Sequence, residues 1–126
     1  MATILLIDDD QVLLKLYSTR LAADHHQVLT AANGQDGLDI VSKKLPDVIV
    51  LDLLMPKLNG FKFIETLKKY PQTQHIPIIV FSSVANQEQY QLLTKLGVTT
   101  FLNKIDITPT QLVAVINKQL LPSPTP

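Results

Sequence analysis

Acidic side chains stand where two short apolar runs end. The run Ile4–Ile7 is followed by Asp8–Asp10, and the run Val48–Leu51 is followed by Asp52. Both runs are rich in branched aliphatic residues, which is typical of strands buried on both faces of a parallel sheet. Carboxylates gathered at one sheet edge repel by roughly 4 kcal/mol per close pair at an effective dielectric of about 20, so they require a cation. Mg²⁺ suits such oxygen ligands, and a carboxylate beside it can act as a nucleophile toward a phosphoryl group.

Two other apolar runs end in side chains that suit the same chemistry. The run Ile76–Phe81 stops at Ser82, whose hydroxyl can donate to a phosphoryl oxygen. The weaker run Val98–Leu102 is followed closely by Lys104, whose ammonium group can balance carboxylates and contact phosphate. Each feature alone also fits an ordinary turn or solvated surface, and Asp10 fits the cap of the next helix. Together the four run ends predict one site.

Strand-like runs alternate with segments of helical spacing along the whole chain. The expected strands are Ile4–Ile7, Gln27–Ala31, Val48–Leu51, Ile76–Phe81 and Val98–Leu102. Apolar steps of three and four predict helices around Leu13, Leu16, Tyr17 and Leu21, and then over Asp36–Lys44, Phe61–Tyr70, Gln87–Leu96 and Thr110–Leu120. This alternation predicts an α/β fold with a doubly wound parallel sheet, which binds ligands at the carboxyl ends of its strands.

The composition predicts one soluble, intracellular domain. The chain has 126 residues, of which 46% are hydrophobic, and its 11 basic and 11 acidic side chains cancel. No overall field therefore draws it to nucleic acid or to an anionic membrane. It has no cysteine, which excludes disulfides and a thiol nucleophile, and no apolar stretch reaches the roughly 18–20 residues of a membrane span.

Four segments resemble the receiver domain of two-component response regulators, over residues 2 to about 121. Ile4-Leu-Leu-Ile-Asp8-Asp9-Asp10 is similar to that family's first strand and acidic cluster, and Val50-Leu-Asp52-Leu-Leu-Met55-Pro56 to its phosphoacceptor segment. Pro77-Ile-Ile-Val-Phe-Ser82 is similar to its fourth strand with the switch hydroxyl, and Phe101-Leu-Asn-Lys104 to its fifth strand with the switch aromatic and the lysine.

The resemblance implies a phosphoacceptor and a metal site. Asp52 is the expected phosphoacceptor, and Asp8, Asp9, Asp52 and the backbone carbonyl of Leu54 are the expected ligands of Mg²⁺ or Mn²⁺. The family is regulatory rather than enzymatic. We therefore expect only autophosphorylation from small phosphodonors and slow autodephosphorylation.

The resemblance also implies a switch. Ser82 is expected to bind the phosphoryl group and draw Phe101 inward, while Lys104 pairs with an acyl phosphate oxygen. The signal then changes the face formed by the fourth helix, the fifth strand and the fifth helix.

The fold, domain bounds and partners follow from the same resemblance. The implied sheet is flavodoxin-like, with five strands in the order 2-1-3-4-5 and five helices in a three-layer sandwich. Residues 1–121 are expected to form the receiver domain, and residues 122–126 a proline-rich tail or truncated linker. The expected partners are a histidine kinase or histidine phosphotransfer protein and a downstream protein target in the cytoplasm, without direct contact to nucleic acid or membrane.

Three positions depart from the family pattern around the fifth strand. Ile105 stands after Lys104, where the family usually has a proline in a cis peptide. A cis bond to a non-proline residue costs about 2.5–4 kcal/mol, so this loop either adopts that bond at a cost or follows another path. Thr99 and Thr100 replace an acidic pair found in members that dimerise through paired charges, which argues against that mode of dimerisation.

Other functions fit less well. The main alternative is a pseudo-receiver, a protein interaction module that is not phosphorylated. A haloacid-dehalogenase-type phosphatase requires a second Asp at the position of Leu54, and a P-loop nucleotidase requires a glycine-rich loop that is absent. A flavin carrier requires donors after the first strand, where the carboxylates would repel its phosphate. His25, His26 and His75 are expected in surface loops.

Two apolar residues predict a long-lived phosphorylated state. Leu54 and Val84 lie two residues beyond Asp52 and Ser82, at positions that flank the attacking water in the family. Neither side chain can orient that water by a hydrogen bond, so hydrolysis is expected to be slow. The combined change Leu54→Asn with Val84→Glu should accelerate the loss of phosphate in a hydrolysis time course. A wild-type lifetime of seconds would contradict this expectation.

Overall fold

The chain alternates strand and helix five times. A computed structural model describes residues 2–53, 59–83 and 86–120. The strands are β1 (Thr3–Ile7), β2 (Gln27–Ala31), β3 (Val48–Leu51), β4 (Ile78–Ser82) and β5 (Thr100–Asn103). The helices are α1 (Gln11–Ala23), α2 (Gly34–Lys43), α3 (Gly60–Lys68), α4 (Gln87–Lys95) and α5 (Pro109–Gln119). Within those described ranges, no helix has the length and apolar character needed to cross a bilayer.

All five strands are parallel and lie in the order β2-β1-β3-β4-β5, which confirms the predicted fold class. The register pairs Ile7 with Leu51 and Ser82 with Asn103. Because parallel strands point the same way, the residues that follow β1, β3, β4 and β5 meet at one edge of the sheet. This edge is called the carboxyl edge below.

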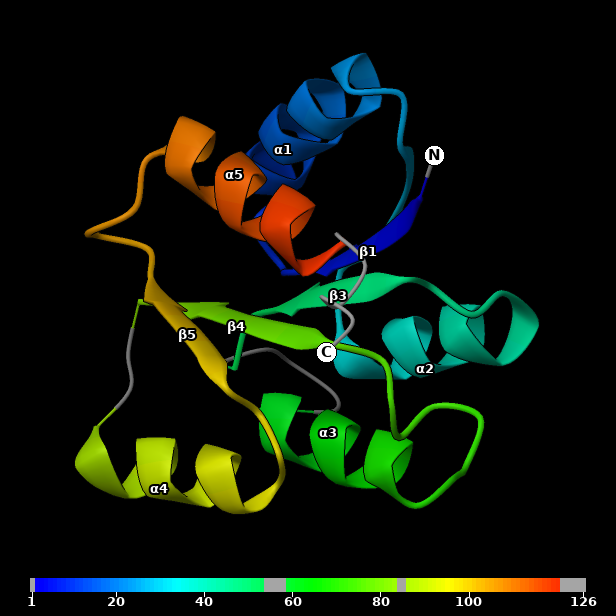
Figure 1. The fold of residues 1–126 in the computed structure, drawn as a ribbon, viewed down its shortest axis with the longest axis vertical. Helices are drawn as coiled ribbons and strands as arrows, with labels where there is room; N and C mark the ends of the chain where they lie inside the picture. Colours follow the sequence, from blue (N-terminus) through cyan, green and yellow to red (C-terminus); the bar gives the residue numbers. More distant parts are fainter. Residues whose placement is uncertain (1, 54–58, 84–85, 121–126) are drawn as a thin grey trace, which may run out of the picture.

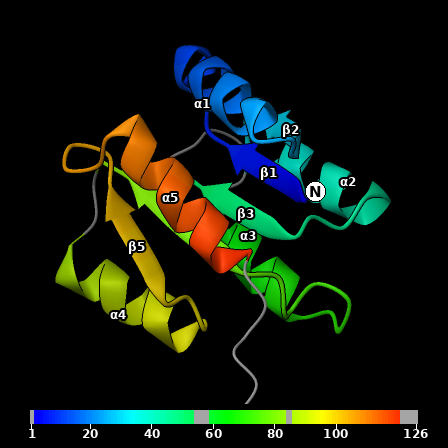
Figure 2. The same ribbon diagram turned by 45° about the horizontal axis from the view of Figure 1, so that its top comes forward.

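The sheet is the middle of three layers (Figure 1). Helices α1 and α5 cover one face, and α2, α3 and α4 cover the other. Figure 2 shows α1 and α5 side by side, in agreement with their direct contact. Side chains alternate along β1, so that Ile4 and Leu6 pack under α1 and α5 while Leu5 and Ile7 pack under α2 and α3. Two largely apolar half-cores thus support both faces of the sheet beneath its carboxyl edge.

Every helix begins with a side-chain cap. The N-cap residues are Asp10, Asn33, Asn59, Asn86 and Thr108, and each accepts a hydrogen bond from a backbone N–H in the first helical turn. Caps of this kind stabilise a helix by about 1 kcal/mol each. They fix where the chain turns from the carboxyl edge of the sheet into the helices.

Several details differ from the sequence prediction. The fourth strand runs over Ile78–Ser82 rather than Ile76–Phe81. The fifth strand begins at Thr100 rather than Val98, because α4 ends in a Schellman motif. In that motif the N–H of Val98 donates to the carbonyl of Leu93, and Gly97 adopts a φ of 91°. In α1 the expected inward residue Leu16 is 45% exposed, and Leu14 is buried instead.

All three histidines lie outside the helices and strands, as expected, but His26 is only partly exposed. This residue is half-buried, and its Nε2 lies 2.8 Å from Oδ1 of Asn117 in α5. The Asn117 amide donates in turn to Asp24 at 3.3 Å. The turn between α1 and β2 is therefore tied to the last helix by side chains far apart in the sequence.

Two glycines allow close contacts around the carboxyl edge, and they differ in what they touch. A Cβ at Gly60 would lie 2.8 Å from Cα of Leu53 and 2.9 Å from the carbonyl oxygen of Asp52. A Cβ at Gly37 would instead meet Cδ1 of Ile7, the end of a side chain, at 2.7 Å. Backbone cannot move aside as a side-chain end can.

We therefore expect Gly60→Ala to destabilise the fold more than Gly37→Ala. Overpacking of this kind costs about 1–3 kcal/mol, and the larger value is expected at Gly60. Urea unfolding of the two variants measures the difference in the free energy of unfolding. Equal losses, or a larger loss at Gly37, would contradict the backbone contact.

Candidate functional site

The two acidic strand ends lie side by side at the carboxyl edge, as predicted. The N–H of Asp8 donates to the carbonyl of Ala31, and the N–H of Asp52 donates to the carbonyl of Ile7, both at 3.0 Å. These bonds continue the β1–β2 and β1–β3 pairing by one residue. Both carboxylates are therefore fixed by the sheet itself rather than by a loop, and their residues are only 3% and 6% exposed.

Lys104 reaches both carboxylates from the end of β5. Its Nζ lies 2.6 Å from Oδ2 of Asp8 and 3.4 Å from Oδ2 of Asp52. Its side chain is only 19% exposed. One ammonium group thus bridges the ends of β1 and β3 within a largely buried cluster.

The cluster keeps an excess of negative charge. Burial raises the pKa of Asp8, and the neighbouring Asp52 raises it further, against the lowering effects of Lys104 and the Asp10 N–H. Burial alone would lower the pKa of Lys104, but Asp8 and Asp52 outweigh that effect and raise it. Burial is the main cause of the raised Asp8 pKa, and one ammonium group stands against the three carboxylates of Asp8, Asp9 and Asp52.

The residues at this edge fit a divalent cation. One carboxylate oxygen each from Asp8, Asp9 and Asp52 lies within 4.8 Å of the others. Asp9 is exposed, so it can bind an ion from the solvent side, whereas Asp10 uses its carboxylate to cap α1. Three hard oxygen donors at a partly open edge are a suitable set for Mg²⁺ or Mn²⁺. Leu54, whose carbonyl was expected to complete the set, lies outside the described residues, as does Val84.

Ser82 and Phe101 lie where the sequence predicted. Ser82 is the last residue of β4 and is 4% exposed, and its carbonyl accepts the N–H of Lys104 at 3.2 Å. Phe101 is half-buried in β5, and its ring packs edge-to-face on Tyr90 of α4 with centroids 5.3 Å apart. The backbone of β5 thus connects the lysine of the cluster to an aromatic contact with α4.

The loop after Lys104 follows a path without a cis peptide. The Lys104–Ile105 bond is trans, as are the other peptide bonds that the structure describes. The N–H of Ile105 donates to the side-chain oxygen of Asn103 at 2.9 Å, and the N–H of Asp106 donates to the carbonyl of Asn103 at 3.0 Å. A proline at position 105 could not make the first of these bonds. Asn103 therefore shapes the turn that holds Lys104 in place.

One contributor was missed by the sequence analysis. The ring of Phe81 lies under the ammonium group of Lys104, with its centroid 5.9 Å from Nζ, and Tyr17 of α1 packs edge-to-face on this ring. This is a cation–π distance, and the ring supports the lysine over the end of β4. The alternation of side chains along β4 places Phe81 on the face covered by α1 and α5. That pattern does not reveal that the Lys104 side chain passes over the Phe81 ring.

Comparisons with known proteins agree with this arrangement. The family model of the response regulator receiver domain matches residues 4–117. Protein PilH of Pseudomonas aeruginosa is 34% identical over 104 residues, which cover 82% of this chain and 86% of PilH. Response regulator PleD of Caulobacter vibrioides is 33% identical over 103 residues, but the match covers only 23% of that longer protein.

The fold comparison gives the same answer. A solved structure of the chemotaxis response regulator CheY4 of Vibrio cholerae superposes with a TM-score of 0.86 at 29% identity, covering 95% of this chain and 99% of that one. Residues 4–117, which the family model matches, contain all four strand ends of the cluster. The chain therefore belongs to the response regulator receiver domain family of two-component signalling.

Proposed function

We propose that this chain is a phosphorylation switch in which Asp52 accepts a phosphoryl group in a Mg²⁺-dependent step. The observation that supports it most is the lysine bridge, with Nζ of Lys104 at 2.6 Å from Asp8 and 3.4 Å from Asp52. The buried carboxylates of Asp8 and Asp52 share only the Lys104 ammonium group. This arrangement is suited to bind Mg²⁺ together with a negatively charged phosphoryl group. An interaction module without phosphorylation would have no use for this costly charge cluster.

In the proposed reaction the Asp52 carboxylate attacks the phosphorus of the donor. A bond forms between a carboxylate oxygen and phosphorus, and the bond from phosphorus to the donor's histidine nitrogen or acyl oxygen breaks, with its electron pair leaving on the donor. Asp8, Asp9 and the Leu54 carbonyl would hold the ion beside Asp52. When bound, Mg²⁺ neutralises charge on the transferring group.

The remaining residues sense the new group. Lys104 already lies beside Asp52, so its ammonium can pair with a phosphoryl oxygen after transfer. The Ser82 hydroxyl, at the buried end of β4, can donate to another oxygen. Phe101 would then leave its contact with Tyr90 and move inward, which changes the surface formed by α4, β5 and α5. A downstream protein that reads this surface receives the signal.

The carboxyl edge also offers apolar contacts to a protein donor. Val12 at the start of α1 is 79% exposed, and Ile105 after Lys104 is 80% exposed. Val12 follows Asp8–Asp10 closely in the sequence, and Ile105 follows Lys104 directly. Exposed apolar residues around a charged centre are suited to a transient protein contact. A cytoplasmic histidine kinase or histidine phosphotransfer protein is the proposed partner.

Incubation with Mg²⁺ and acetyl phosphate tests the phosphoacceptor directly. Intact-mass analysis should show one added phosphoryl group on the wild type and none on Asp52→Asn, because the amide is a poor nucleophile. Asp10→Asn is the matched control. Asparagine caps a helix as well as aspartate does, so this variant should be phosphorylated like the wild type.

Two outcomes would reject the proposal. A wild-type protein that gains no phosphate while Mg²⁺ is present would favour the pseudo-receiver alternative. Equal phosphorylation of wild type and Asp52→Asn would show that another residue is the acceptor.

Removal of the Lys104 ammonium group should lower the free energy of unfolding. Lys104→Met leaves two buried carboxylates without their shared cation, so the free energy of unfolding without Mg²⁺ should fall by about 1–3 kcal/mol. Added Mg²⁺ should recover part of this loss, because the ion binds the folded state. Lys95→Met, at an exposed position in α4, is the control and should change stability by less than about 0.5 kcal/mol. A Lys104→Met protein that is more stable than the wild type would contradict the account.

A further inference from the structure

Two hydrogen bonds fix the chain on either side of the Lys104 side chain. The N–H of Lys104 donates to the carbonyl of Ser82 at 3.2 Å, and the N–H of Ile105 donates to Oδ1 of Asn103 at 2.9 Å. Beyond the backbone, lysine has a flexible stem of methylene groups and loses much rotamer entropy when its ammonium group is held in one place. The position of the ammonium group therefore depends on the groups that it contacts.

One of these contacts involves no carboxylate. Nζ of Lys104 lies over the ring of Phe81, 5.9 Å from its centroid. Phe81 is only 2% exposed, and the attraction between a cation and an aromatic face increases where water is excluded. The ring belongs to β4, which lies between β3 and β5 in the sheet. It is therefore placed under the route by which Lys104 reaches Asp52.

A second aromatic side chain restrains this ring. Tyr17 of α1 is 4% exposed and packs edge-to-face on Phe81, with centroids 5.8 Å apart and planes at 90°. Such pairs are more favourable than burial alone. Both aromatic residues line, together with Asp8 and Asp52, a void of about 10 Å³. Since one water molecule needs roughly 10–15 Å³, the space between the rings and the carboxylates excludes bulk solvent.

The two ion pairs alone do not keep the ammonium group beside Asp52. The shorter of them, at 2.6 Å, is to Asp8, which shares the candidate metal site with Asp9 and Asp52. A divalent ion bound there competes with Lys104 for the Asp8 carboxylate, because both are cations. The contact with Phe81 uses none of these oxygens, so the ion does not remove it.

We propose that Phe81 is a positioning residue for the phosphorylation of Asp52. Its ring, restrained by Tyr17, keeps the Lys104 ammonium group over the end of β4 when a metal ion takes over Asp8, and so within reach of the incoming phosphoryl group. This role rests on the proposed function and adds to it two side chains that are not among the expected ligands of the metal or the phosphoryl group. Because the ring acts only through Lys104, its removal should be visible first in the lysine itself.

Nuclear magnetic resonance tests the contact without any phosphodonor. In the wild type the side-chain protons of Lys104 should resonate upfield of those of the exposed Lys95, because an aromatic ring shields protons above its face. This upfield shift should persist when Mg²⁺ is added. Phe81→Leu should abolish the shift and Tyr17→Leu should reduce it, whereas Tyr17→Phe, which keeps both rings, should recover it.

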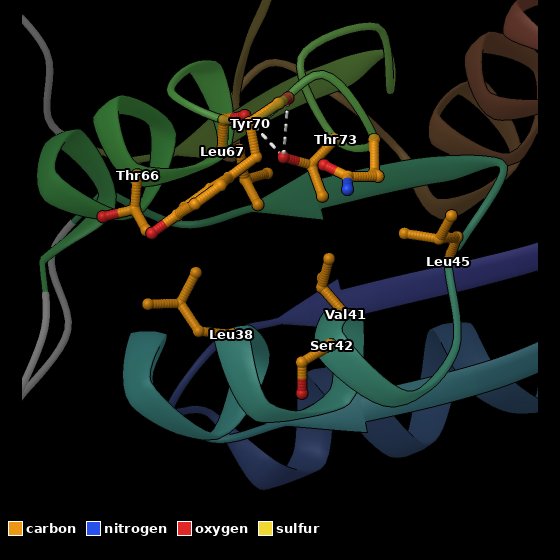
Figure 3. Close-up of a pocket in the computed structure, with 9 residues that line it drawn as sticks. Leu38, Val41, Ser42, Leu45, Thr66, Leu67, Tyr70 and Thr73 are labelled. Atoms are coloured by element: carbon orange, nitrogen blue, oxygen red, sulfur yellow. Dashed lines mark hydrogen bonds between the residues drawn. The ribbon is translucent and has the colours of Figure 1, made fainter.

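Phe63→Leu is the matched control for Phe81→Leu. Phe63 is fully buried, but it lies in the half-core on the other face of the sheet. That half-core includes Val41 and Leu67, which Figure 3 shows at a groove between α2 and α3 whose lining includes none of the acidic cluster. The variant should lose stability in urea as Phe81→Leu does, and it should leave the Lys104 resonances unchanged.

A phosphorylation time course completes the test. With Mg²⁺ and acetyl phosphate, Phe81→Leu should be phosphorylated about five- to tenfold more slowly than the wild type, because a displaced ammonium group no longer meets the transferring group. Phe63→Leu should keep the wild-type rate, and Tyr17→Phe should recover the rate lost in Tyr17→Leu. Circular dichroism verifies that each variant is folded.

The possible outcomes separate the positioning role from the proposed function. A wild type whose Lys104 protons show no upfield shift, or lose it in Mg²⁺, overturns the positioning role even if Asp52 is phosphorylated. A Phe81→Leu protein that is phosphorylated at the wild-type rate overturns it as well. A wild type that keeps the shift but gains no phosphate rejects the proposed function, and the positioning role with it. Should Phe81→Leu not fold, the wild-type shift and the comparison of Tyr17→Leu with Tyr17→Phe decide.

Discussion

The contact of Lys104 with Asp8 and Asp52 is the interaction on which the site depends. Neighbouring strands lie about 4.8 Å apart, and β4 lies between β3 and β5, so a side chain from β5 must cross one whole strand to reach Asp52. Lysine has the length for this crossing. Ser82 at the end of β4 is small enough to leave the path open, and the ring of Phe81 supports the ammonium group along it. The side chains at positions 81, 82 and 104 therefore suit one requirement, that a cation from β5 must reach Asp52 across β4.

This arrangement ties the chemistry to the edge of the sheet. The carboxylates follow the inner strands β1 and β3, which apolar side chains support on both faces. Phe101 lies on the edge strand β5, and Lys104 follows that strand directly. In the proposed switch, a change of charge at Asp52 would act first on Lys104, which it contacts, and then through the β5 backbone on the contact between Phe101 and Tyr90. A rigid centre and a responsive edge are suited to a switch that converts a local charge into a surface change.

The sequence predicted the fold and the cluster well, because both follow from pattern and topology. Short apolar runs ending in Asp8, Asp52, Ser82 and Lys104 must converge once the strands are parallel, and the structure brings these four together. The sequence could not reveal the path of the loop at Ile105. That path depends on a hydrogen bond in which the Asn103 side chain accepts the N–H of Ile105. Nor could the sequence reveal the contact of His26 with Asn117, which is 91 residues away. Leu16 was misplaced because helical spacing alone permits either it or Leu14 to face the sheet.

The central claim is that Lys104 and β5 respond to a phosphoryl-like group at Asp52. Nuclear magnetic resonance with Mg²⁺ and beryllofluoride, which mimics a phosphoryl group on a carboxylate, measures this response without chemical turnover. The account predicts that the resonances of the Lys104 ammonium and the Phe101 ring both shift in the wild type, and that neither shifts in Asp52→Asn. Unchanged Lys104 and Phe101 resonances in the wild type would contradict it.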